Sequence, residues 1–217
     1  MLRRTLSRLL LLVMISIPAG STLSAEEQPS RMREDKTHVQ TWNQFVADLL
    51  RFHEQMIAGK QISKTSKSGG YASQPDYYTE EEFRDASGRL LSRLQWEQKN
   101  PENLHLIELF VYDSEGRVVR DYTGAYLPYY RNAPTQTLLS LHRYNGQLHA
   151  FRTFDASAEF ILESCRGRYQ GKDVSISVDI DEKEALEGSP NTVLTSKVYA
   201  ACFKGLAQTA GKYLQPQ

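Results

Sequence analysis

The sequence contains only two cysteines, Cys165 and Cys202, and they do not form a Cys-x-x-Cys pair. This spacing gives no support to a catalytic redox role. In an oxidising compartment an even pair first indicates a structural disulfide, with two buried free thiols and a redox pair as the alternatives. We expect a Cys165–Cys202 disulfide, which would stabilise the fold by roughly 3–4 kcal/mol in the chain-entropy description.

The common catalytic and nucleotide-binding motifs are also missing. The sequence has no G-x-S-x-G, no H-E-x-x-H, no Walker loop and no G-x-G-x-x-G. No residue is therefore predicted to be catalytic, and no cofactor is predicted. An enzyme is not excluded, because the carboxylate pair of a glycoside hydrolase is defined by distance in space and not by sequence spacing.

The chain lacks an excess of either charge, with 26 basic and 26 acidic residues. Removal of residues 1–25, which carry three arginines and no acid, would leave 23 basic and 26 acidic residues. This balance gives no electrostatic reason to expect nucleic acid or an anionic membrane surface as a partner. The expected partners are an envelope protein or a small ligand.

Long apolar runs are absent except at the N-terminus. Arg3, Arg4 and Arg8 precede the apolar run Leu9–Ile17, and small residues follow to Ala25. This order is typical of a secretory signal peptide, and the run is too short to span a membrane well. We expect cleavage after Ala25, a polar mobile leader at 26–36, and a soluble mature chain that is periplasmic or secreted, with no stable membrane span.

Two helices are predicted before the strands begin. Apolar residues recur at three- and four-residue steps after the capping box Thr37–Gln40, and Gly59 is a natural stop. They are Val39, Trp42, Val46, Leu49, Leu50, Met56 and Ile57. The Ser/Lys/Gly-rich segment 60–76 is interpreted as a flexible loop, a lid or a linker. A second capping box, Thr79–Glu82, predicts another helix that ends by Pro101.

From Leu104 onward the apolar period becomes two and turn signals become regular. The pattern predicts an antiparallel meander of about six strands, with Asn145-Gly146 as the strongest hairpin signal. Residues 181–188 are interpreted as an acidic loop, and a last helix is predicted from Ser189-Pro190 to Tyr213. The expected fold class is α+β, a single domain over residues 37–217 with the last helix packed on the sheet.

A histidine pair in the Asn145-Gly146 hairpin is a candidate metal site. A two-residue loop formed by those residues would place His142 directly opposite His149, with Cβ atoms about 5 Å apart. Two imidazoles so placed suit zinc or copper, although stable sites usually have three or four ligands. The alternative interpretation is a pair of solvated or core histidines.

Tyrosines cluster in the segment from Tyr122 to Tyr130. Tyr122, Tyr126, Tyr129 and Tyr130 surround a Gly/Pro turn, and tyrosine suits binding surfaces because its apolar ring has a polar tip. The alternative is that these rings pack on the sheet edges. We predict an exported binding or accessory protein without catalytic activity; the alternatives are a small secreted hydrolase of cell-wall or carbohydrate material and a metal-handling protein.

Overall fold

The computed structural model describes residues 36–127 and 131–216. The predicted signal peptide, nearly all of the predicted leader, Tyr129 and Tyr130 lie outside these residues. No helix of the described residues is long and apolar enough to cross a membrane.

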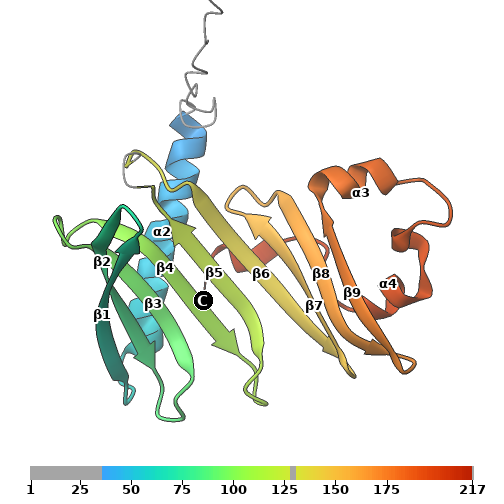
Figure 1. The fold of residues 1–217 in the computed structure, drawn as a ribbon, viewed down its shortest axis with the longest axis horizontal. Coiled ribbons are helices and arrows are strands. Elements are labelled where there is room, and N and C mark those ends of the chain that lie inside the picture. The colour runs from blue at the N-terminus through green and yellow to red at the C-terminus, as the bar shows by residue number, and fades with distance from the viewer. Residues whose placement is uncertain (1–35, 128–130, 217) are drawn as a thin grey trace, which may run out of the picture.

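A nine-stranded antiparallel sheet dominates the structure, and one long helix precedes it (Figure 1). The helix is α2 (Lys36–Ile57). The strands are β1 (Ser63–Tyr71), β2 (Gln74–Arg84), β3 (Leu90–Glu97), β4 (Leu104–Tyr112), β5 (Val118–Ala125), β6 (Gln136–Asn145), β7 (Leu148–Asp155), β8 (Phe160–Tyr169) and β9 (Lys172–Asp179). Each strand pairs with its sequence neighbours, so the sheet is a continuous meander.

A C-terminal segment of short helices follows the sheet. It contains α3 (Ile180–Leu186), the 3₁₀ turn η1 (Val193–Thr195), α4 (Lys197–Cys202) and a second 3₁₀ turn, η2 (Gly211–Leu214). Helix α2 and the later part of this segment lie on the same side of the sheet (Figure 1). The residues that pack beneath them define the inner face of the sheet, and the opposite face is the outer face.

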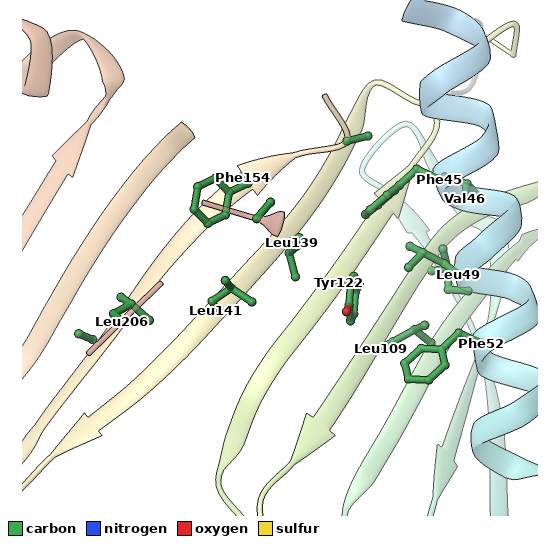
Figure 2. Packing of buried hydrophobic residues seen from close by; sticks show 14 of the residues in the cluster. Phe45, Val46, Leu49, Phe52, Leu109, Tyr122, Leu139, Leu141, Phe154 and Leu206 are labelled. Carbon is green, nitrogen blue, oxygen red and sulfur yellow. The ribbon is translucent and has the colours of Figure 1, made fainter. Parts of the chain in front are cut away.

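Helix α2 forms because its apolar residues fall on one side. Phe45, Val46, Leu49 and Phe52 are buried and point toward β4 and β5, where they meet Leu109 and Tyr122 (Figure 2). The exposed opposite side carries polar residues, which is the pattern of an amphipathic helix on a sheet. The predicted first helix is therefore present.

The C-terminal segment is fixed to β7 and β8 by a buried polar network. Arg152 and Glu163 form an ion pair with side chains that are 2% and 0% exposed. Arg152 Nη1 also donates to the carbonyl of Ala207 at 2.6 Å, and the Tyr199 hydroxyl donates to Glu163. Burial and this hydrogen bond raise the pKa of Tyr199 well above its usual value. The network joins the inner face to α4 and to the chain beyond it.

The predicted disulfide is present between Cys165 on β8 and Cys202 at the end of α4. Both residues are completely buried. The bond closes a loop with a sequence separation of 37 residues and holds α4 against the inner face. It therefore acts on the same segment as the Arg152–Glu163 network.

The prediction of a second N-terminal helix was wrong. Residues 79–94 form most of β2 and β3, joined by a turn in which Asp85 Oδ1 accepts from the backbone N–H groups of Ser87 and Arg89. Gly88 has φ +83°, which glycine adopts without steric cost. The same arrangement recurs at Asp113-Ser-Glu-Gly-Arg117, so an Asp-x-x-Gly-Arg turn is used twice.

Three other segments differ in secondary structure from the prediction. Most of segment 60–76 is not a loop: it forms β1 and the start of β2, so the sheet has nine strands where about six were predicted. The acidic segment 181–188 lies largely in α3. The single C-terminal helix is instead η1, α4 and η2, because the extended backbone of Ser196 separates η1 from α4 and positive φ at Gly205 interrupts the helical path after α4. The α+β class itself holds.

Candidate functional site

The sheet opens between the ends of β5 and β6. Pairing between these strands runs from Ala125–Gln136 to Arg120–Leu141 and ends there. Strand β5 nevertheless continues to Val118, which pairs with β4, and β6 continues to Asn145, which pairs with β7. The two strand ends are therefore held by their other neighbours and leave a split between them.

A cavity of about 410 Å³ lies at this split. Strands β5 and β6 provide one part of its lining, and the C-terminal segment provides the other. The lining residues are Val119, Arg120, Leu141, His142, Arg143, Gly205, Leu206, Ala207 and Tyr213. Two of the nine are arginines, and none of these lining residues is acidic. Its size is within the range of small-molecule binding sites.

The two arginines are held in different ways. The Arg120 guanidinium stacks on the ring of Tyr213 at 4.8 Å from its centroid. Arg143 is exposed, and its guanidinium lies beside the Cα of Gly205, where an added Cβ would be 3.7 Å from Nε. By strand alternation both side chains point to the inner face, since Arg120 pairs with Leu141 and residue 143 is two positions further.

Of the predicted histidine pair only His142 lines this cavity, and the hairpin has a different register from the one predicted. Asn145 pairs with Leu148, and the two-residue loop is Gly146-Gln147, so His142 lies opposite Phe151. Gly146 has φ +61°, as the first central position of a type II′ turn requires. The two imidazoles are diagonal neighbours on the outer face rather than directly opposed.

The histidines form a hydrogen-bonded chain that ends on Asp121. His142 Nε2 lies 2.5 Å from Asp121 Oδ2, and His142 Nδ1 lies 2.9 Å from His149 Nε2. If Nε2 of a neutral His142 donates to the carboxylate, Nδ1 accepts from His149. The ring of His149 stacks on Tyr144 at 4.5 Å. Burial and the neighbouring His142 lower the pKa of His149.

The imidazole nitrogens that would coordinate a shared metal ion are already hydrogen-bonded. The facing nitrogens of His142 and His149 bond to each other, and the second nitrogen of His142 is bonded to Asp121. Within residues 36–127 and 131–216 there is no group of three or more His, Cys, Asp or Glu side chains arranged to hold a metal. The metal-site hypothesis therefore gains no support from this arrangement.

Of the four tyrosines predicted to form a binding surface, the structure describes Tyr122 and Tyr126. Tyr122 is completely buried between Phe45 and Phe52, and its hydroxyl donates to the Tyr213 carbonyl at 3.0 Å. Tyr126 is half-buried, and its hydroxyl donates to Asn43 on α2 at 3.1 Å. Both described rings thus pack within the molecule, and a binding surface based on Tyr122 is not proposed further.

A second aromatic cluster lies near the β1 edge of the sheet. Tyr71, Tyr77 and Tyr78 surround His105, with ring centroids 5.1–5.9 Å from the imidazole. The Tyr71 hydroxyl shares a 2.5 Å hydrogen bond with His105 Nε2. The imidazole occupies the space between the rings, which makes this cluster a packing arrangement rather than an open cage.

Sequence reasoning did not identify Arg120 and Arg143 as site residues. They are 23 positions apart, and only the pairing of β5 with β6 brings them to the same split. Gly205 and Tyr213 come from the C-terminal segment, which was predicted as one continuous helix. The tertiary arrangement, and no local motif, creates the site.

Comparisons with known proteins add little. No family model matches the chain, and no curated protein matches it. A DUF3836 family protein from Bacteroides vulgatus ATCC 8482 is similar over 55% of this chain and 98% of its own, with 9% identity and a TM-score of 0.27. A DUF3836 family protein from Parabacteroides distasonis ATCC 8503 is similar over 59% and 98%, with 11% identity and a TM-score of 0.26. At these scores the likeness carries no argument.

Proposed function

We propose that this chain is an exported binding protein that takes a small organic anion into the cavity between β5 and β6. The observation that carries the proposal is the charge of the lining, which has Arg120 and Arg143 and no acidic residue among the lining residues that the structure describes. Guanidinium groups bind carboxylate and phosphate through charge-assisted hydrogen bonds. Val119, Leu141 and Leu206 would contact an apolar part of the same ligand.

Export is part of the proposal and has two supports. The order of residues 1–25 is that of a signal peptide, and the Cys165–Cys202 disulfide is of the kind that persists in oxidising compartments. Mass spectrometry of the chain from an envelope fraction tests this directly. We expect the mass of a chain that begins at Glu26, lower by two hydrogens because the cysteines are joined. A chain with an intact N-terminus, found in the cytoplasmic fraction, would contradict export.

Binding is favoured over hydrolysis by the bonding of His142. An Asp–His pair resembles the base of a hydrolase, because a carboxylate orients and supports an imidazole. Both nitrogens of His142 are already bonded, one to Asp121 and the other to His149. No nitrogen of His142 is left to accept a proton from a nucleophile while these bonds persist.

The test is a titration of the purified mature protein with octanoate, followed by NMR chemical shifts. Octanamide is the matched neutral control, since it keeps the chain and removes the charge. Arg143→Gln is expected to weaken octanoate binding about tenfold or more, because a hydrogen bond to a charged group contributes about 1.5–3 kcal/mol. Lys197→Gln, on the exposed start of α4 and outside the cavity, should leave the affinity unchanged.

Two results would overturn the proposed function. Equal affinity for octanoate and octanamide would show that the arginines do not recognise charge. Octanoate-induced shifts that are unaltered by Arg143→Gln would place the ligand somewhere else on the protein.

A further inference from the structure

A second hollow is lined by residues that neighbour those of the β5/β6 cavity. It has a volume of about 500 Å³ and lies where the turns β6–β7 and β8–β9 meet the end of α4. Asn145, Leu148, Arg168, Tyr169 and Lys204 are among its lining residues. Nothing in the proposed function uses this hollow.

The two hollows share a border. On β6, Arg143 lines the first and Asn145 lines the second, and these positions are about 7 Å apart along the strand. In the C-terminal segment, Gly205 lines the first and Lys204 the second. The Asn145 amide donates to the carbonyls of Ala201, Cys202 and Lys204 at 3.3, 3.1 and 3.0 Å, which fixes the border in place.

The charge of the first hollow continues into the second. Lys204 and Arg168 line the second hollow, and its described lining residues, like those of the first, include no acidic residue. The whole chain has as many acidic as basic residues, so this local excess does not follow from composition. Arg168 is paired with Asp173 at 3.3 Å, and the two side chains are exposed by 60% and 92%. Such exposed pairs contribute little and exchange readily.

From this continuity we propose that the natural ligand is an extended molecule with at least two anionic groups. The first group binds against Arg143 and Arg120 in the β5/β6 cavity, and the second binds against Lys204 and Arg168 in the adjoining hollow. The inference rests on the proposed function and names the class of its ligand. Linking two modest contacts in one molecule raises affinity because the second contact becomes intramolecular.

The experiment compares dodecanedioate with dodecanoate, which have the same chain length but two anionic groups or one. On the wild-type protein the dianion is expected to bind about tenfold tighter, the gain of one further charge-assisted contact. In the double variant Lys204→Gln/Arg168→Gln this advantage disappears, while octanoate binds as it does to the wild type. These side chains are exposed, so the variants are expected to fold, and Lys197→Gln again serves as the control.

The outcomes separate this inference from the proposed function. Equal affinity for the two probes, with octanoate binding still weakened by Arg143→Gln, refutes the two-headed ligand and leaves the single-anion site intact. Tighter binding of the dianion that survives Lys204→Gln/Arg168→Gln also refutes it, because the second group would then lie outside the adjoining hollow. Absence of saturable binding by any of the carboxylates refutes both proposals.

Discussion

Gly124 on β5 lies directly beneath Val46 of α2, so closely that a Cβ at position 124 would be 2.7 Å from Val46 Cγ2. The same atom would be 3.3 Å from Ile107 Cγ2. The helix can approach the sheet at this point only because residue 124 has no side chain.

Gly124→Ala is therefore expected to lower the free energy of unfolding by about 1–3 kcal/mol, the usual cost of overpacking. Urea denaturation measures it. In the double variant Gly124→Ala/Val46→Ala the clash is removed, so the two costs should not add. Strict additivity would show that Val46 is not the obstacle.

The turn between β7 and β8 should gain stability from a glycine. Ala158 has φ +69°, in a turn where Asp155 Oδ1 accepts from the N–H groups of Ser157 and Glu159, as Asp85 and Asp113 do in their turns. Ala158→Gly is expected to raise the unfolding free energy by about 0.5–1 kcal/mol.

The converse change, Gly88→Ala, should lower the unfolding free energy by about the same amount. No atom lies within 4 Å of the added Cβ, so its effect comes from the backbone alone. Equal stability of wild type and Ala158→Gly in urea would contradict this explanation.

Replacement of Arg152 should be among the single substitutions that lower the free energy of unfolding most. Arg152→Met leaves Glu163 buried without its main counter-charge, which is expected to cost about 3–5 kcal/mol. Because Arg152 also binds the Ala207 carbonyl, amide protons near residue 207 should exchange faster with solvent.

The double variant Arg152→Met/Glu163→Leu should recover most of the lost stability, since it removes the unpaired charge as well. If Arg152→Met alone unfolds at the wild-type urea midpoint, the pair does not hold the C-terminal segment.

Stability should fall as the pH drops below about 6.5. His53 is buried between α2 and β3, and its Nδ1 shares a 2.9 Å hydrogen bond with Ser92 Oγ. Burial lowers the pKa of His53. The unfolded chain, with an ordinary histidine pKa of about 6.5, therefore binds the proton more readily than the folded protein. The stabilisation is complete above that pH and is lost between it and the lower folded pKa.

His53→Gln should reduce this dependence by up to about 1.4 kcal/mol per pH unit, the value for one proton. Burial lowers the pKa of His105 and His149 too, so a smaller slope remains. Urea unfolding at pH 7.5, 6.5 and 5.5 measures the slopes, and an unchanged slope in the variant would exclude His53 as a source.

The sequence predicted the strands from residue 104 onward because their apolar residues alternate and their turns contain Asp, Asn and Gly. Strand β1 gave no such signal: it lies at the edge of the sheet, and Tyr71 is its only large apolar residue. Residues 79–94 gave the wrong signal, because Phe83, Leu90 and Leu94 also fit a helical period. The turn at Asp85 repeats the pattern at Asp113, and comparison of the two would have identified it.

Of the residues that line the candidate site, only His142 was singled out from the sequence, and it was predicted as a metal ligand. The hairpin signal at Gly146 was recognised, but the loop was placed one residue too early, because Asn145 joins the ladder and its side chain donates to three carbonyls at and just beyond the end of α4. Arg120 and Arg143 carry no local pattern. Their proximity depends on where the pairing of β5 and β6 ends, which is a property of the whole sheet.

The neighbour-to-neighbour order of the strands has a consequence for how the chain folds. Each strand needs only the preceding one, so loops of two to ten residues are closed at each step and the entropic cost stays small. The sheet can grow strand by strand from β1 to β9. The C-terminal segment is different, because Cys202 must return across 37 positions to reach Cys165. Oxidation of that pair is therefore expected to be the last step, and it completes the wall of the cavity only after the sheet has formed.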